Sequence, residues 1–178
     1  MSGVHGAIFG PDGSTNERAL RDALMGEDDI VVVDSAEVIT AAVSRPGVTH
    51  GRLLGGNLDA VATAAGWALP SLRGAILLLE AVNMGIGQVD RQLTMLRRAG
   101  HLSGLVGIAL GQFTGFDIGG IYNIIDVLKD HLHALDVPVL GGLPLGHGDD
   151  PQSVLVGASA TLEAETGRLV IHRNPTVR

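Results

Sequence analysis

Short apolar runs alternate along the chain with segments in which apolar residues recur at helical spacing. Continuous apolar runs predict buried strands over 75–79 and 105–110, and a third short strand over 137–140. Helical periodicity predicts amphipathic helices over 89–99 and 121–135. Strands that alternate with helices of this length are typical of parallel βαβ units with right-handed crossovers.

The two ends of the chain show different patterns. Residues 154–163 and 169–172, on either side of a Thr166-Gly167 turn, predict a C-terminal β-hairpin that is appended to the sheet. In the first third of the chain the predicted elements are a helix over 14–26, a strand over 30–33, weaker strands over 38–43 and 48–54, and a helix capped by Asn57 over 58–65.

The predicted fold class is therefore α/β, with a mostly parallel sheet, flanking helices and a C-terminal β-hairpin. The chain has 178 residues, of which 46% are hydrophobic, and 26 glycines that fit many short turns. This length and composition predict a single domain over 1–178.

Charge and composition exclude several functional classes. The net charge of −7 and the aromatic content of 3% provide neither the basic surface nor the stacking platforms that nucleic-acid binding needs. No apolar run approaches the roughly 20 residues of a membrane-spanning helix, so we expect no membrane partner. The chain has no cysteine, which fits a reducing compartment, and the first ten residues show no secretion signal. We expect a cytoplasmic protein.

Two ionisable residues follow strand-like apolar runs. Glu80 ends the run that starts at Ala75, and His147 lies between two glycines after Pro144. The carboxyl ends of parallel strands share one edge of a sheet, where α/β folds bind ligands, so we expect the two side chains within hydrogen-bonding distance. A carboxylate and an imidazole in this arrangement are two thirds of a hydrolytic triad.

Structural explanations for these two residues stay open. Glu80 could pair with a nearby arginine or cap the next helix, and His147 could be an exposed residue of a tight turn. The sequence contains no Gly-x-Ser-x-Gly nucleophile elbow, and Ser159, the nearest approach to one, falls in the predicted hairpin.

No other residues combine into a site. His131 and His133 lie two positions apart on a predicted helix and are expected to be exposed to solvent. Asp90 is at the start of its predicted helix, where the macrodipole favours a carboxylate, and Arg91 is expected to form a structural ion pair with a neighbouring carboxylate. The remaining histidines do not have the spacing of metal ligands, and the glycine-rich segments complete no nucleotide-binding motif. We therefore expect no metal and no cofactor.

Five segments, in this order and spacing, together resemble the LD-carboxypeptidases, the serine peptidases that include the microcin C self-immunity enzymes. The segments are LLGGNL (53–58), ILLLE (76–80), VDRQLTML (89–96), GIALGQF (107–113) and PVLGGLPLGHG (138–148). Residues 4–6 are similar to the interdomain segment of that family. The family departs from this chain after Glu80, where its members often carry an acidic residue and a Pro-Tyr pair. We expect residues 81–88 to form a mobile loop that borders the cleft.

The resemblance implies a swivelling β/β/α-type domain that supplies the catalytic glutamate, Glu80, and the catalytic histidine, His147. It also implies that the nucleophilic serine belongs to an N-terminal domain that is missing here, so that this chain alone is inactive. The full protein would hydrolyse the bond before a C-terminal D-residue in a small peptide such as a murein tetrapeptide, and would form a homodimer. The alternative is a freestanding, non-catalytic binding domain that kept the fold.

Overall fold

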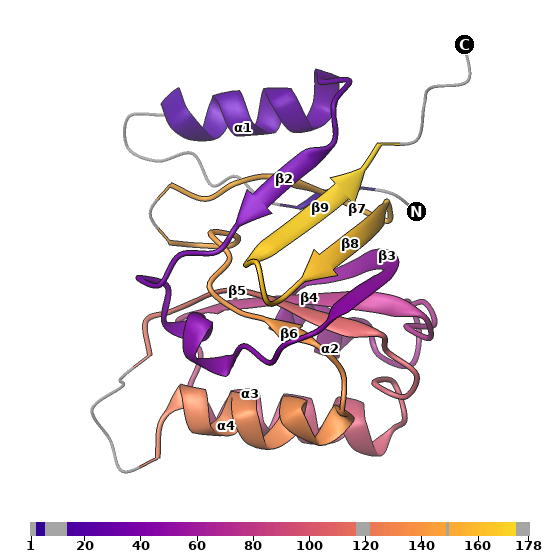
Figure 1. Ribbon diagram of the computed structural model, residues 1–178. Coiled ribbons are helices and arrows are strands. Elements are labelled where there is room, and N and C mark those ends of the chain that lie inside the picture. Colours follow the sequence, from indigo (N-terminus) through magenta and orange to yellow (C-terminus); the bar gives the residue numbers. More distant parts are fainter. Residues whose placement is uncertain (1–2, 6–13, 117–121, 149, 174–178) are drawn as a thin grey trace.

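The computed structural model describes residues 3–5, 14–116, 122–148 and 150–173, with the side chains of 3–5 and 14–16 left out. Position 6, in the segment similar to the interdomain segment, position 121, the first of the predicted helix over 121–135, and position 149 lie outside these ranges. Seven strands form one sheet in the order β2-β9-β8-β3-β4-β5-β6 (Figure 1). These strands are β2 (Ile30–Val33), β3 (Val48–Asn57), β4 (Ala75–Val82), β5 (Gly107–Thr114), β6 (Val139–Leu140), β8 (Ser159–Glu163) and β9 (Arg168–His172).

Parallel pairing joins β3, β4, β5 and β6, and antiparallel pairing joins β2, β9, β8 and β3. The predicted α/β class with a mostly parallel core is confirmed. The hairpin of β8 and β9 does not lie at the end of the sheet, because it is inserted between β3 and β2. The predicted strand over 154–163 is interrupted before β8, and its first part, β7 (Val154–Val156), pairs with β1 (Gly3–His5) in a separate ladder.

Helices connect the parallel strands and cover one face of this half of the sheet (Figure 1). They are α2 (Leu58–Ala64), α3 (Ile86–Arg98) and α4 (Ile124–Leu132), followed by the 3₁₀ helix η2 (His133–Leu135), while α1 (Ser14–Met25) lies near β2. The apolar stripes of the three connecting helices form a core with one face of β4 and β5. A second core on the other face includes Leu53, Ile76 and Leu78 of the sheet together with Leu143 and Leu145. Because both faces of β4 are covered, its apolar run is continuous.

The predicted strand over 38–43 is wrong, because this segment forms the 3₁₀ helix η1 (Ile39–Val43). Tertiary contacts decide its conformation: the Thr40 hydroxyl donates to the Gly111 carbonyl at 2.9 Å and accepts from the Gly142 N–H at 3.0 Å. Thr40 is fully buried. These bonds fix η1 against the middle of β5 and the segment that follows β6, so the β-branched composition of the segment does not determine its structure.

Candidate active site

Glu80 is a carboxylate near the carboxyl end of β4, and its side chain is completely buried. The residues before it, from Ala75 to Leu79, are all buried as well, so the strand carries this charge into the centre of the sheet. Burying a carboxylate costs several kcal/mol unless hydrogen bonds compensate for its lost hydration. The groups that surround Glu80 therefore matter for both stability and chemistry.

A β-bulge in β5 makes room beside Glu80. Leu79 pairs with Leu110, but Ala81 pairs with Phe113, so β5 has one extra residue in the stretch opposite Glu80. Gly111 belongs to this stretch, and a Cβ at that position would lie 3.1 Å from the Glu80 Cβ and 2.2 Å from the Leu145 carbonyl oxygen. Only a glycine allows the strand, the loop and the carboxylate to approach one another this closely.

The loop that carries His147 is fixed on both sides of the histidine. Before it, Leu145 is fully buried and its carbonyl accepts the Gln112 N–H at 2.7 Å. After it, the Gly148 N–H donates to Gln112 Oε1 at 2.9 Å. Gln112, a mostly buried residue of the bulge, therefore holds the loop by its backbone and by its side chain.

Nδ1 of His147 lies 2.8 Å from Oε2 of Glu80, which confirms the predicted hydrogen bond. The His147 side chain is 31% exposed, whereas that of Glu80 is 0% exposed. A carboxylate accepts, so Nδ1 carries the proton and Nε2 of the neutral ring is left as an acceptor. Because Nδ1 points at a buried group, solvent reaches the ring from the opposite edge. The arrangement can accept a proton at Nε2 and stabilise the resulting imidazolium.

Gly146 permits this contact. Its φ of +119° is one that other residues rarely adopt, and a Cβ there would lie 2.8 Å from Oε2 of Glu80. The glycine next to the histidine thus leaves space for the carboxylate as well as turning the chain.

Asn57 and Gln112 are site residues that the sequence analysis did not assign. Asn57, the predicted helix cap, accepts the N–H groups of Asp59 and Ala60 at 3.0 and 3.4 Å, and it is the partner of Glu80 in the β3–β4 ladder. The signal for Gln112 was a polar residue after a glycine inside an otherwise apolar strand.

The connection after Glu80, expected as a loop over 81–88, is shorter than that, because 81–82 belong to β4 and 86–88 belong to α3.

The expectation that His131 is exposed is wrong. Its side chain is buried, and Nε2 lies 2.8 Å from Oδ1 of Asp90, which joins α4 to α3. His133 is half-buried and its Nε2 lies 2.9 Å from the Val43 carbonyl oxygen, so it donates to η1. Both rings therefore hold helices in place. Periodicity could not show this, because Asp90 and His131 are 41 positions apart.

Other kinds of site are not evident in the part of the chain that is described. These residues contain no group of three or more His, Cys, Asp or Glu side chains suited to a metal ion. Ser159, the nearest approach to a nucleophile elbow, lies in β8 as expected. Within the same residues, no helix has the length and apolar character to cross a membrane.

A family model and individual relatives of known name point to the same protein family. The family model of the LD-carboxypeptidase C-terminal domain matches residues 50–162. The murein tetrapeptide carboxypeptidase of Pseudomonas aeruginosa is 33% identical over 117 residues, which cover 64% of this chain and 38% of that protein. A Streptomyces coelicolor protein that carries the name of a carboxypeptidase is 35% identical over 176 residues, 96% of this chain and 55% of its own length.

Solved structures agree with the sequence relatives. The muramoyltetrapeptide carboxypeptidase of Oxalobacter formigenes superposes with a TM-score of 0.81 at 25% identity, covering 98% of this chain and 62% of that chain. The microcin C7 self-immunity protein MccF superposes with a TM-score of 0.67 at 25% identity, covering 74% of this chain and 40% of that chain. The chain thus spans about half the length of the proteins that it resembles, and it belongs to the LD-carboxypeptidase family, whose C-terminal domain it contains.

Proposed function

We propose that this domain supplies Glu80 and His147 to a Ser-Glu-His triad whose serine belongs to a second domain outside these 178 residues. The reaction is hydrolysis of the amide bond before a C-terminal D-residue of a murein-type peptide. The observation that carries the proposal is the 2.8 Å contact between a buried carboxylate and an imidazole that solvent can reach. The names of the relatives support the substrate class.

The geometry supports a separate role for each residue in the proposed reaction. Nε2 of His147 takes the proton of the serine hydroxyl as the serine oxygen attacks the scissile carbonyl, and then gives that proton to the leaving amine. Glu80 accepts the Nδ1 proton throughout, which selects the tautomer with a free Nε2 and stabilises the charged ring. Water then hydrolyses the acyl-enzyme with the same ring as base.

A chimera tests this function. In the Streptomyces coelicolor relative, this chain would replace the segment that it matches, and release of D-alanine from a murein tetrapeptide would be measured. We expect release by the chimera and none by the 178-residue chain alone, because a triad acts as a unit. Release by the isolated chain that disappears with His147→Ala would show that the nucleophile lies within these residues.

We include two further features in the proposal, a cytoplasmic location and a homodimer. The absence of cysteine supports a reducing compartment. Exposed apolar side chains such as Trp67 and Val48 support self-association. Light scattering on the purified chain tests the second feature, and a strict monomer at high concentration would contradict it.

A further inference from the structure

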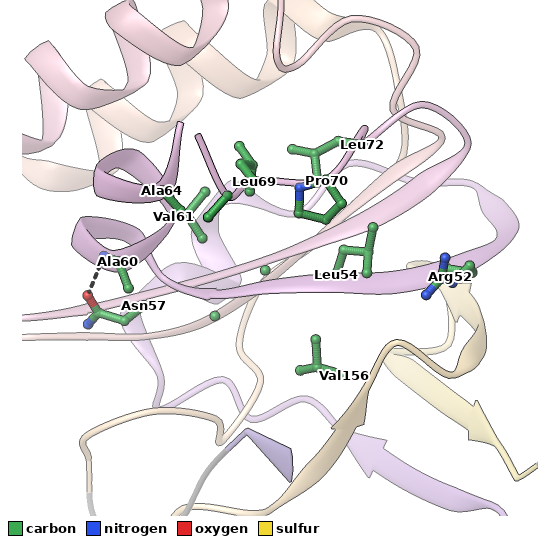
Figure 2. A pocket seen from close by; sticks show the side chains of 13 residues that line it. Arg52, Leu54, Asn57, Ala60, Val61, Ala64, Leu69, Pro70, Leu72 and Val156 are labelled. Carbon is green, nitrogen blue, oxygen red and sulfur yellow. Dashed lines mark hydrogen bonds between the residues drawn. The ribbon is translucent and has the colours of Figure 1, made fainter. Parts of the chain in front are cut away.

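A groove with a volume of about 610 Å³ runs along β3 from Asn57 to Arg52. Figure 2 shows these two residues at opposite ends, with Leu54 between them. One wall consists of α2 and the segment that follows it, including Val61 and Leu72, and Val156 of β7 lies on the other side of the strand. The lining is mainly apolar, with one polar group at one end and one cation at the other.

The Asn57 end of the groove adjoins the candidate active site. Asn57 and Glu80 are partners in the parallel ladder of β3 and β4. Neighbouring strands lie about 4.8 Å apart, and β3 lies between its open edge and β4, so a ligand on that edge lies about 10 Å from the backbone of Glu80.

The edge of β3 is open along the groove. The ladder with β8 ends at Arg52, and the last bonds on that side join Leu53 to Gly157 and Ala158 at 2.7 and 2.9 Å. From Leu54 to Asn57, the described part of the chain provides strand pairing only from β4. An unpaired strand edge beside an apolar wall is a surface that binds extended peptides by main-chain hydrogen bonds.

Arg52 is positioned to bind an anion at the far end. Its Nε donates to the Gly157 carbonyl at 3.3 Å, which orients an otherwise exposed guanidinium. Among the described residues it has no carboxylate partner, so its terminal N–H donors are available. A guanidinium with two adjacent donors suits a carboxylate.

We propose that this groove binds the acyl part of an extended peptide substrate and that Arg52 binds a carboxylate several residues before the scissile bond. The proposal rests on the proposed function, because that function makes the Asn57 end of the groove the end nearest the scissile bond. Arg52 precedes Asn57 by five positions, which is roughly 16 Å along a strand. An acyl part of four to five residues in extended form spans this distance, so the groove would take peptides longer than a tetrapeptide, in which three residues precede the scissile bond.

Trp67 provides a direct readout of binding. It is the single tryptophan of the chain, is 79% exposed, and lies in the turn between the groove residues Ala64 and Ala68. The fluorescence of Trp67 would be titrated with acetyl-Glu-Ala-Leu-Ala-D-Ala and with its glutamine counterpart, and calorimetry would provide an independent measurement. We expect the glutamate peptide to bind roughly three- to tenfold more tightly.

Variants assign this preference to the groove. Arg52→Gln should bind both peptides equally, whereas Arg73→Gln, an exposed arginine outside the groove, should keep the preference. Ala60→Phe places a ring in the groove from an exposed position on α2 and should weaken both peptides. Equal binding of the two peptides by the unmodified chain, a preference that survives Arg52→Gln, or no binding at millimolar peptide would overturn the proposal.

The same binding experiment distinguishes failure of the groove proposal from failure of the triad proposal. Glu80→Gln should keep the peptide preference, because the carboxylate does not line the groove. A domain that binds with this preference but gives an inactive chimera would refute the triad and support the groove. An active chimera whose domain shows no preference between the two peptides would support the triad and refute the groove.

Discussion

His147 Nδ1 and Glu80 Oε2 form a hydrogen bond of 2.8 Å between a loop and the central strand β4. The strand fixes the carboxylate, and the bonds of Gln112 to Leu145 and Gly148 fix the loop on either side of the ring. Neither partner needs to move to make the contact. The base of the proposed triad is therefore already assembled in this domain.

This contact predicts a distinctive proton resonance. The Nδ1 proton, shielded by a buried carboxylate, should exchange slowly with water and appear as a downfield signal in the ¹H NMR spectrum. Glu80→Ala should abolish the signal. His133→Ala, which removes a ring that bonds to a backbone carbonyl, should leave it unchanged. A signal that persists without Glu80 would contradict the assigned contact.

Gly146→Ala should destabilise the domain and displace the carboxylate. A positive φ costs other residues about 1–2 kcal/mol, and here the new Cβ would also lie 2.8 Å from Oε2 of Glu80. Gly66→Ala is the matched control, because its φ is +89° but nothing lies within 4 Å of the added Cβ. Chemical denaturation should show a larger loss for Gly146→Ala than for Gly66→Ala. Equal losses would show that the carboxylate tolerates the methyl group.

Asp29 should make stability depend on acidic pH. The Arg173 backbone N–H at 2.9 Å and then the His172 ring at 2.8 Å hold the pKa of this carboxyl below its ordinary value of 3.8. A lower pKa in the folded state means that the stabilisation is complete above about pH 4 and is lost as the pH falls through the folded-state value. The stability difference between the unmodified chain and Asp29→Asn should therefore shrink on acidification. NMR titration of the Asp29 carboxyl at or above 3.8 would contradict this.

The Asp90–His131 pair should couple α3 to α4. The two side chains lie 2.8 Å apart, and the histidine is almost completely buried. A double-mutant cycle with Asp90→Ala and His131→Ala should give a favourable coupling of about 1 kcal/mol in unfolding free energy. Additive losses would show that the pair contributes only by packing.

Much of the fold could be predicted because local patterns agree with tertiary burial. The apolar runs of β4 and β5 lie in a sheet covered on both faces, and the cap at Asn57 begins α2 as its side chain predicts. The segment over 38–43 failed because hydrogen bonds of Thr40 to distant glycines outweigh its strand propensity. Local sequence does not contain that information.

The candidate site, like the fold, could be predicted from the sequence only in part. Glu80 and His147 could be paired from sequence because both follow strand-like runs that a parallel sheet aligns, and because the family resemblance names them. The bulge at Gly111 and the two bonds of Gln112 depend on the register between β4 and β5, which a one-residue shift decides. The groove beside Asn57 depends on where the pairing of β3 with β8 ends.

The most direct test of the triad is the kinetics of D-alanine release by the chimera described above, with His147→Ala, Glu80→Gln and the double variant. We expect a loss on the order of a thousandfold for His147→Ala and a smaller loss for Glu80→Gln. The double variant should be no slower than His147→Ala alone, because Glu80 acts only through the ring. Losses that multiply in the double variant, or a His147→Ala chimera that keeps most of its activity, would contradict the assignment.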